Sequence, residues 1–367
     1  MFPCSLLPLA RVLVTGVAFA AAVRLSADAD PNPPADPTPA PAAPDNPFTQ
    51  QARDAGVFTL YYENDYFAGQ DRHYTNGFKF SWISGDLSDW GQTGWRQSVV
   101  DHLPFVNRPG TQKNFGFAFG QFMYTPQDIS RVPPDPADRP YAGWSYLELT
   151  FIAKTKKIMD TLSIQAGMVG RASQADEFQR LVHKWLSDEE PLGWDYQLQN
   201  EFGLNVVCER KWRLYARALD RHLGVDLIPH AGFSLGNVST FANAGFTLRL
   251  GFNLPSDFGV STIRGASLPN GPIDDDDPRV SPNRDWSFFV FGGGDGRAVA
   301  WDIFLDGNTF RDSASVDKKP FVGDAFYGVG VIIGRWQIVY SQAVRSLEFE
   351  GQQGKNYYGS IMLSYAF

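Results

Sequence analysis

Hydrophobic and polar residues alternate along most of the chain after residue 56, in short runs separated by segments rich in Gly, Pro, Asn and Asp. Period-two alternation with β-branched and aromatic residues predicts β-strands. Thirteen runs show this pattern: 57–64, 77–84, 115–122, 144–154, 162–169, 196–207, 227–236, 244–254, 286–293, 299–307, 325–334, 336–344 and 357–367. In this interpretation the stretch 208–220 extends the sixth run. The pattern therefore indicates an all-β fold.

Three features favour a transmembrane antiparallel β-barrel over a soluble β-sandwich. A signal-like segment precedes the strands, aromatic residues lie near predicted strand ends, and the chain stops at Phe367 after the alternating "YYGSIMLSYAF". A terminal Phe on such a strand resembles the assembly signal of outer-membrane barrels, and the aromatics suit the interfacial girdles. In lipid, only a closed barrel satisfies the backbone of strands. Because bacterial single-chain barrels have even strand numbers, we expect twelve, with one run misread or outside the wall.

Long connections separate some of the predicted strands. The longest are 86–112, 124–142, 170–194 and 255–285. Bacterial barrels have long extracellular loops and short periplasmic turns. We therefore expect all four connections on the outer side of the membrane.

One of these connections has helical periodicity. The segment "SQADEFQRLVHKWLSDEE" (173–190) begins with Ser173, and Asp176 follows three residues on, as in a capping box. Gln179 and His183 lie one turn apart on one side. A different side is apolar and consists of Phe178, Leu181, Val182 and Trp185. We expect a short helix in an extracellular loop, with its apolar side on the barrel rim and the Gln–His side aimed elsewhere.

The first 52 residues are excluded from the predicted fold. An arginine and an apolar run (11–23) precede the small-x-small sequence "ADA" (27–29), so residues 1–29 are interpreted as a secretory signal peptide. Residues 30–52 are rich in Pro and Ala and predict an extended linker. The barrel domain is therefore expected to cover residues 53–367.

Composition narrows the function classes. The formal net charge of −8 argues against nucleic acid as the main partner, because phosphate binding needs a clustered basic surface. Cys208 is the single cysteine after the predicted leader, so no disulfide framework is expected within one mature chain. No G-x-S-x-G, H-E-x-x-H, P-loop or C-x-x-C motif is present.

Several polar segments each have a structural reading and a chemical one. Asn64 and Asp65 end the first run, where they are either a loop entry or site residues. In "DRHYTNG" (71–77), Asn76 and Gly77 are interpreted as turn chemistry and Thr75 as a strand residue. The segment "DRPYAGW" (138–144) is interpreted as structural, with two small residues that permit close backbone approach. The run "DDDD" (274–277) is interpreted as a solvated loop.

The order of these segments resembles a known family. The chain contains "ND" (64–65), "DRHYTNG" (71–77), "DRPY" (138–141) and "QRLVHKWLSDEEPLGWDYQLQNE" (179–201). This succession is similar to that of the lipid A 3′-O-deacylase family, which comprises outer-membrane barrels of Gram-negative bacteria. The resemblance covers roughly residues 55–367. It implies a twelve-stranded barrel, a site near the outer rim, calcium dependence, and hydrolysis of the ester that holds the 3′-linked acyloxyacyl group of lipid A.

The resemblance also implies site residues. Catalytic roles pass to His183, Gln179, Glu189, Asn64 and Thr75, and metal binding to Asp65, Asn64 and Thr75. A lysine of the family aligns loosely with Arg131, which is expected to bind substrate. We expect His183 to act as general base, Glu189 to orient its imidazole, and calcium to stabilise the oxyanion.

Two alternatives stay open. One is an outer-membrane phospholipase-type esterase with the same site. The other is a non-enzymatic structural or channel barrel in which the polar helix is a plug. Under all three hypotheses the protein is embedded in the outer membrane. Lipid A or lipopolysaccharide is the expected substrate, and no obligate protein partner is expected.

Overall fold

The computed structural model describes residues 52–65, 73–87, 111–186, 191–220, 222–260 and 270–367. The side chains of residues 73–75, 182, 183, 185 and 186 lie outside this description. The predicted leader and residues 30–51 of the predicted linker also lie outside it.

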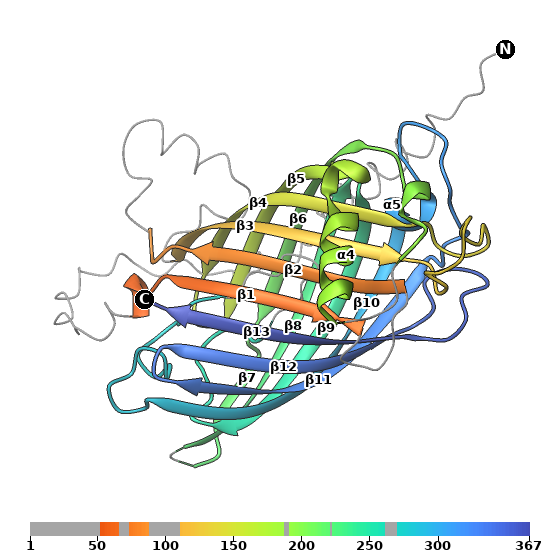
Figure 1. Cartoon of the computed structure of the whole chain (residues 1–367). Helices are drawn as coiled ribbons and strands as arrows, with labels where there is room; N and C mark the ends of the chain where they lie inside the picture. The colour runs from red at the N-terminus through yellow and green to blue at the C-terminus, as the bar shows by residue number, and fades with distance from the viewer. Residues whose placement is uncertain (1–51, 66–72, 88–110, 187–190, 221, 261–269) are drawn as a thin grey trace, which may run out of the picture. The chain divides into compact units, whose positions relative to one another are not determined.

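The strands form a closed antiparallel barrel (Figure 1). They are β1 (Val57–Asn64), β2 (His73–Ile83), β3 (Gln112–Thr125), β4 (Ala142–Lys154), β5 (Ile158–Val169), β6 (Glu201–Trp212), β7 (Tyr215–Ala218), β8 (Leu223–Gly236), β9 (Ser239–Phe252), β10 (Trp286–Asp302), β11 (Phe321–Ile333), β12 (Trp336–Arg345) and β13 (Asn356–Ala366). Neighbours in sequence pair, and β1 also pairs with β13. Strand β6 pairs directly with β8, so the short β7 stands outside the ring, and the wall has the predicted twelve strands.

The extra predicted run has a simple origin. The runs 286–293 and 299–307 both begin within one strand, β10. The glycines at 292–294 and 296 interrupt its apolar pattern, so one strand was read as two. The stretch 208–220 splits between the end of β6 and the separate β7, so it extends the sixth strand only as far as Trp212.

The alternation along the strands separates a lipid face from a lumen face. On β1, Phe58 and Leu60 are exposed on the outer face, whereas Thr59 and Tyr61 are buried inside. Large apolar side chains are exposed on the outer face around the wall, for example Phe119, Leu147, Leu248 and Ile338. Among the described residues, no helix is both long enough and apolar enough to cross a membrane.

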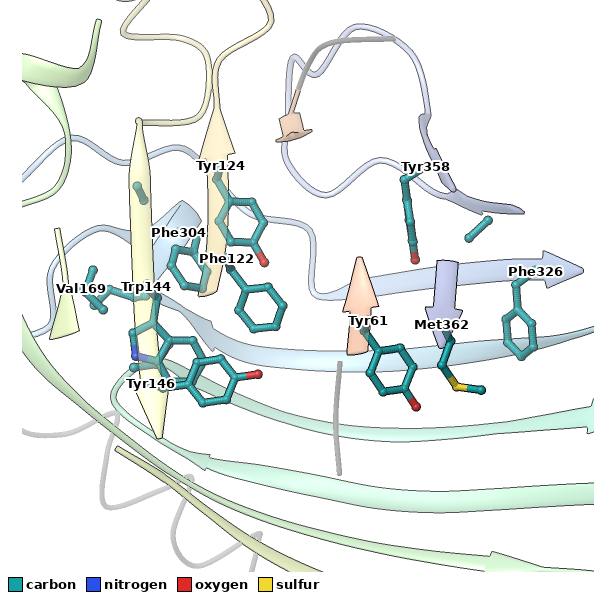
Figure 2. Close-up of a cluster of buried hydrophobic side chains, with 14 of the residues drawn as sticks. Tyr61, Phe122, Tyr124, Trp144, Tyr146, Val169, Phe304, Phe326, Tyr358 and Met362 are labelled. Carbon is teal, nitrogen blue, oxygen red and sulfur yellow. The ribbon is translucent and has the colours of Figure 1, made fainter. Parts of the chain in front are cut away.

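The lumen contains packed aromatic and charged side chains. Trp144 and Tyr146 stack at 4.3 Å between ring centroids, within the cluster drawn in Figure 2. Lys79 and Glu148 form a fully buried ion pair at 2.7 Å. The pair satisfies charges that would otherwise be costly to bury.

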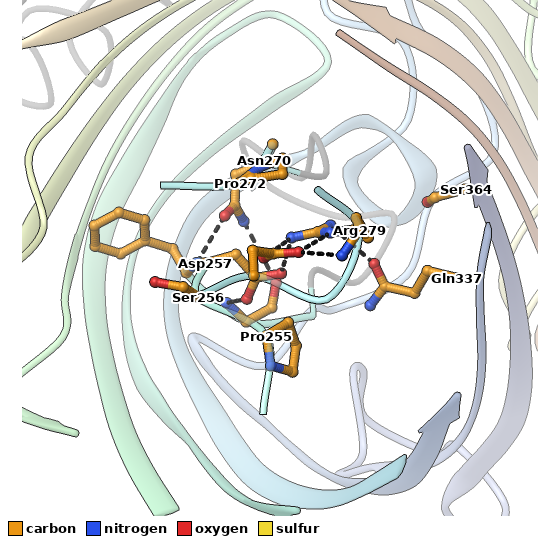
Figure 3. Close-up of polar contacts among 12 residues, drawn as sticks. Pro255, Ser256, Asp257, Asn270, Pro272, Arg279, Gln337 and Ser364 are labelled. Atoms are coloured by element: carbon orange, nitrogen blue, oxygen red, sulfur yellow. Dashed lines mark hydrogen bonds and ion pairs between the residues drawn. The ribbon is translucent and has the colours of Figure 1, made fainter. Parts of the chain in front are cut away.

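The connection after β9 enters the lumen. Figure 3 shows Asp257 and Arg279 inside the ring of strands. Arg279 pairs with Asp257 at 2.8 Å and donates to Gln337 of β12 at 3.0 Å. Asp277, predicted to be solvated, is fully buried and pairs with Arg279 at 2.6 Å, so that prediction was wrong for this member of the acidic run. A buried guanidinium needs carboxylate partners, which explains the difference.

The long connections do not all lie at one end. We call the end where β1 finishes at Asn64 the loop end, and the end with Gly56 and Phe367 the terminal end. Because the strands alternate in direction, the connections 124–142 and 170–194 join strands at the loop end. The connections 86–112 and 255–285 join strand ends at the terminal end, so the prediction of four one-sided loops was wrong for these two.

Candidate active site

Helix α4 (Ala175–Leu186) lies against the outer, lipid-facing side of the wall (Figure 1). It packs on β3 and β4, and Ala175 shares a buried cluster with Met123. Phe178 places its ring 5.0 Å from that of Phe78 on β2. Phe78 alternates with the exposed Phe80, so this contact is on the lipid face. The predicted loop helix is therefore present, although it begins at Ala175 instead of Ser173.

The start of α4 is held close to the wall. Gln121 Nε2 and Ser145 Oγ each donate to the Ser173 carbonyl oxygen at 2.7 Å. A Cβ atom at Gly143 would lie 2.2 Å from the Ala175 Cβ atom, so glycine is needed at this approach. Gly143 is one of the two small residues of "PYAGW", and the close approach predicted for that segment is present.

The orientation of α4 differs from the prediction. Gln179 is 1% exposed and its Oε1 atom accepts a 2.7 Å hydrogen bond from Trp194 Nε1, whereas Leu181 is 54% exposed. Phe178 of the predicted apolar side does pack on the wall, but the expectation that Leu181 also packs there was wrong, and Gln179 is buried against Trp194. Outside a barrel the surroundings are lipid, so an apolar side chain is stable facing outward and a polar one is satisfied against the protein.

Gln179 also has an unused donor. Its Nε2 atom is buried and has no hydrogen-bond partner within the described part of the chain. Trp194, in the short helix η3 (Trp194–Tyr196), is itself held by Tyr141, with ring centroids 5.1 Å apart. The amide oxygen of Gln179 is thus held by Trp194, while its nitrogen has no acceptor among the described residues.

A second polar group lies on the same outer face, at the loop end of β1 and β2. Asn64 stands directly opposite Asn76 in the strand register. Both amide nitrogens donate to the Tyr62 hydroxyl, at 3.1 Å and 3.2 Å. Asp65 follows at once and is 1% exposed. Asn76 lies within β2, so its interpretation as a turn residue was wrong.

Thr75 is the extra residue of a β-bulge. The β2–β3 register shifts between Tyr74 and Asn76, which leaves Thr75 without a cross-strand partner. Bulges re-aim side chains and are frequent beside active sites. The Thr75 side chain lies outside the described residues.

The helix and the asparagine pair approach the same patch of wall. Phe178 contacts Phe78, and Phe78 follows Asn76 by two residues on one face of β2, a separation of about 7 Å. Gln179 comes directly after Phe178, and position 183 follows it by one helical turn. The His183 side chain and the whole of Glu189 lie outside the described residues, so their predicted roles stay predictions.

Arg131 lies in the exposed connection between β3 and β4. Its guanidinium pairs with Asp135, and the Ala137 backbone N–H, together with Arg131, lowers the pKa of that carboxyl group. The connection contacts the segment after α4, because Leu192 N donates to the Ile129 carbonyl at 2.9 Å. Arg131 is therefore near the helix connection, but its charge is partly neutralised.

Arg139 has a structural role, as predicted for its segment. It is fully buried, its guanidinium lies 4.4 Å from the centroid of the Tyr124 ring, and it pairs with Glu348 at 3.2 Å. These contacts hold the β3–β4 connection over the lumen.

The residues at the ends of β1 and β2 fit calcium in kind. Calcium prefers carboxylate and amide oxygens, which Asp65, Asn64 and Asn76 carry. The Asn76 Oδ1 atom is buried with no hydrogen-bond partner in the part of the chain that is described. Among those residues, no three His, Cys, Asp or Glu side chains are grouped as a metal site.

Comparison with known proteins decides the family. The family described as "Outer membrane protein LpxR" matches residues 30–367. The chain belongs to this family. It is thus a member of the lipid A 3′-O-deacylase family indicated by its motifs, and an outer-membrane β-barrel protein.

Solved structures of LpxR and other barrels are also similar. The chain matches LpxR from Salmonella typhimurium at 17% identity with a TM-score of 0.68, covering 85% of this chain and 100% of that one. It also matches the β domain of the Bordetella autotransporter BrkA at 8% identity with a TM-score of 0.41, covering 86% and 100% of the two chains. No curated protein matches. At 17% identity the match to LpxR from Salmonella typhimurium bears on the fold alone.

Several residues of this site in the LpxR-family protein were not predicted from the sequence. Tyr62, Gln121 and Trp194 each hold a predicted residue or the helix in place. For Tyr62 and Gln121 the signal was available, since both continue the outward-facing positions of their strands into the loop end. Trp194 stood in the matched motif, but its contact with Gln179 depends on the path of the chain between them.

Proposed function

We propose that this chain is an outer-membrane esterase that hydrolyses the 3′-linked acyloxyacyl group of lipid A. The observation that carries the proposal is the buried Gln179 amide of α4, which accepts a hydrogen bond from Trp194 and has an N–H donor with no partner among the described residues. A polar site on the outside of a barrel is accessible from the leaflet. A membrane lipid therefore reaches it sideways, without entering the lumen.

The reaction is ester hydrolysis. His183 takes a proton from water, and the hydroxide oxygen attacks the acyl carbonyl carbon. The bond between the acyl carbon and the sugar oxygen then breaks, and the protonated imidazole returns its proton to that sugar oxygen. The acyloxyacyl chain leaves as a carboxylic acid. Glu189 orients the imidazole, and the Gln179 Nε2 donor contacts a substrate oxygen. No serine nucleophile is needed.

Calcium has a supporting role in this proposal. Asp65, with oxygens of Asn64 and Thr75, would hold it. When bound, the ion stabilises the negative charge that develops on the carbonyl oxygen. The chain itself orients the Asn64 amide, because the Tyr62 hydroxyl holds it, and Thr75 stands at the bulge of β2.

Arg131 meets a phosphate of the substrate in this proposal. A guanidinium suits phosphate, because it donates two parallel hydrogen bonds. Phosphate has to displace Asp135 from Arg131, so the ion pair lowers the gain from this contact. Both side chains are exposed, which makes that exchange easy.

The channel alternative has less support. The lumen contains the buried Lys79–Glu148 pair and the connection that carries Asp257 and Arg279. A conducting pore would need water in place of these packed groups. A phospholipase-type esterase would use the same residues, and the experiment below separates it from a lipid A deacylase.

The test is mass spectrometry of lipid A and glycerophospholipids from Gram-negative cells that express the chain. We expect lipid A that has lost one acyloxyacyl group with the wild type. We expect unmodified lipid A with His183→Ala or with a calcium chelator. His222→Ala is the matched control, because this histidine pairs with Asn253 at the terminal end and should leave activity intact.

Two results would contradict the proposal. Lysophospholipid without any change in lipid A would favour the phospholipase. Unchanged lipids together with conductance in planar bilayers would favour the channel.

A further inference from the structure

Asn76 has no role in the mechanism above, yet its position is unusual. Its side chain is 2% exposed on the outer face of β2, directly opposite Asn64. The Oδ1 atom has no hydrogen-bond partner among the residues described. A buried acceptor without a donor is costly, and a ligand or an ion is one group that can satisfy it.

The Tyr62 hydroxyl orients this atom. It accepts hydrogen bonds from Asn64 Nδ2 at 3.1 Å and from Asn76 Nδ2 at 3.2 Å. Because the nitrogen and oxygen of an amide lie on opposite sides of one carbon, a nitrogen turned toward Tyr62 turns the Asn76 oxygen away from it. The hydroxyl thus holds two neighbouring amides in defined orientations on one patch of wall.

We propose that Asn76 Oδ1 is an additional oxygen ligand of the calcium ion expected at Asn64 and Asp65, with Tyr62 as the positioning residue. This inference rests on the proposed function, because the ion belongs to that site. A hard cation accepts neutral amide oxygens alongside a carboxylate. Asp65 supplies the charge, is buried, and directly follows Asn64 in the sequence. A bound cation would satisfy Asn76 Oδ1, which has no donor among the described residues.

The test is calcium binding, measured by isothermal titration calorimetry on the purified chain in detergent after removal of metal. Asn76→Leu removes the oxygen and should weaken binding on the order of 10-fold or more. Asn76→Asp keeps the oxygen and adds charge, so it should bind at least as tightly as the wild type. Tyr62→Phe keeps every ligand and should weaken binding less than Asn76→Leu does.

Asn114→Leu is the matched control. Asn114 is also a buried amide, donates to the Ser84 carbonyl at 2.9 Å, and has an Oδ1 atom without a partner in the described structure. It lies toward the terminal end of β3, away from Asn64. This variant should bind calcium like the wild type. Heat-modified mobility on gels identifies folded barrels in every sample.

The results separate this inference from the proposed function. A folded Asn76→Leu variant that binds calcium like the wild type overturns the inference, even if lipid A is deacylated. If that variant binds calcium normally but its KM for lipid A rises, the oxygen meets a donor of the substrate, which also overturns it. If calcium binding depends on Asn76 while the wild type leaves lipid A unchanged, the inference stands and the proposed function fails.

Discussion

Gly143→Ala tests whether the seat of α4 on the wall determines activity. The added Cβ atom would lie 2.2 Å from Ala175 Cβ and 2.3 Å from Ser173 Oγ. Carbon atoms in contact rest about 3.5–4.0 Å apart, so the start of the helix has to move outward by roughly 1.3–1.8 Å. Gln179 lies one turn along the same helix, and a rigid helix transmits much of this shift to it.

The expected effect is a loss of rate with the barrel intact. A misplacement of about 1 Å costs on the order of 100-fold, which corresponds to about 2.7 kcal/mol in the barrier. We expect kcat for lipid A in mixed micelles to fall by about that factor, because the Gln179 donor no longer meets its target. Urea unfolding of the barrel should change little, since the conflict lies outside the wall.

Gly120→Ala is the matched control on the neighbouring strand. Its Cβ atom would lie 2.5 Å from the Tyr146 hydroxyl, on the lumen face of β3. This variant should lose stability, while its folded fraction keeps a near-normal kcat. The reasoning is refuted if Gly143→Ala keeps the wild-type kcat, or if Gly120→Ala lowers kcat as strongly.

Three other predictions concern different parts of the molecule. Lys79→Met should destabilise the barrel by about 3–5 kcal/mol in urea unfolding, because Glu148 is left as an unpaired buried charge. Adding Glu148→Gln to this variant should restore most of the lost stability. Asp135→Asn should lower KM for phosphorylated lipid A, because it frees the guanidinium of Arg131. An unchanged KM would contradict the phosphate contact, and so would the same decrease in KM in an Arg131→Ala background. For Asp257, burial opposes the charged form, but neighbouring guanidinium groups outweigh it and lower the pKa. Its stabilising contribution is therefore present above the ordinary carboxyl pKa and lost as pH falls through the lowered one, so Asp257→Asn should lower stability near neutral pH and flatten the acid limb of a stability–pH profile.

Alternation and the chain end were sufficient to predict the barrel. A strand that crosses lipid must turn alternate residues toward lipid and lumen, so each predicted strand shows the alternation in its own sequence. The strand number was correct because closure requires an even count, although β10 was read as two strands. The motif order also led to the family, because several short patterns in one order are specific even where each alone is weak.

Placement of the long connections and of α4 depended on tertiary structure. The direction of each strand decides at which end of the barrel a connection lies. The predicted strand list contained one extra run, so it did not give these directions. The apolar pattern of α4 was read as a contact face, but Leu181 is exposed and Gln179 is buried against Trp194. A hydrophobic pattern shows that one side avoids water, and lipid and protein core satisfy that demand equally.

Residues 64, 65, 75, 179 and 183 were nominated as site residues because the motifs that contain them resemble those of the lipid A 3′-O-deacylase family. The placement of Asn64 and of the helix that carries Gln179 on the outer wall arises from pairing across β1, β2 and β3 and from the close approach at Gly143, contacts between residues distant in the chain. The sequence by itself therefore determined the barrel, through the local alternation of its strands, and nominated candidate site residues, through the order of its motifs. Only the tertiary structure decided which face of the wall holds Asn64 and the helix of Gln179 and which neighbours orient them, because that depends on strand pairing and on the packing of a helix against the wall.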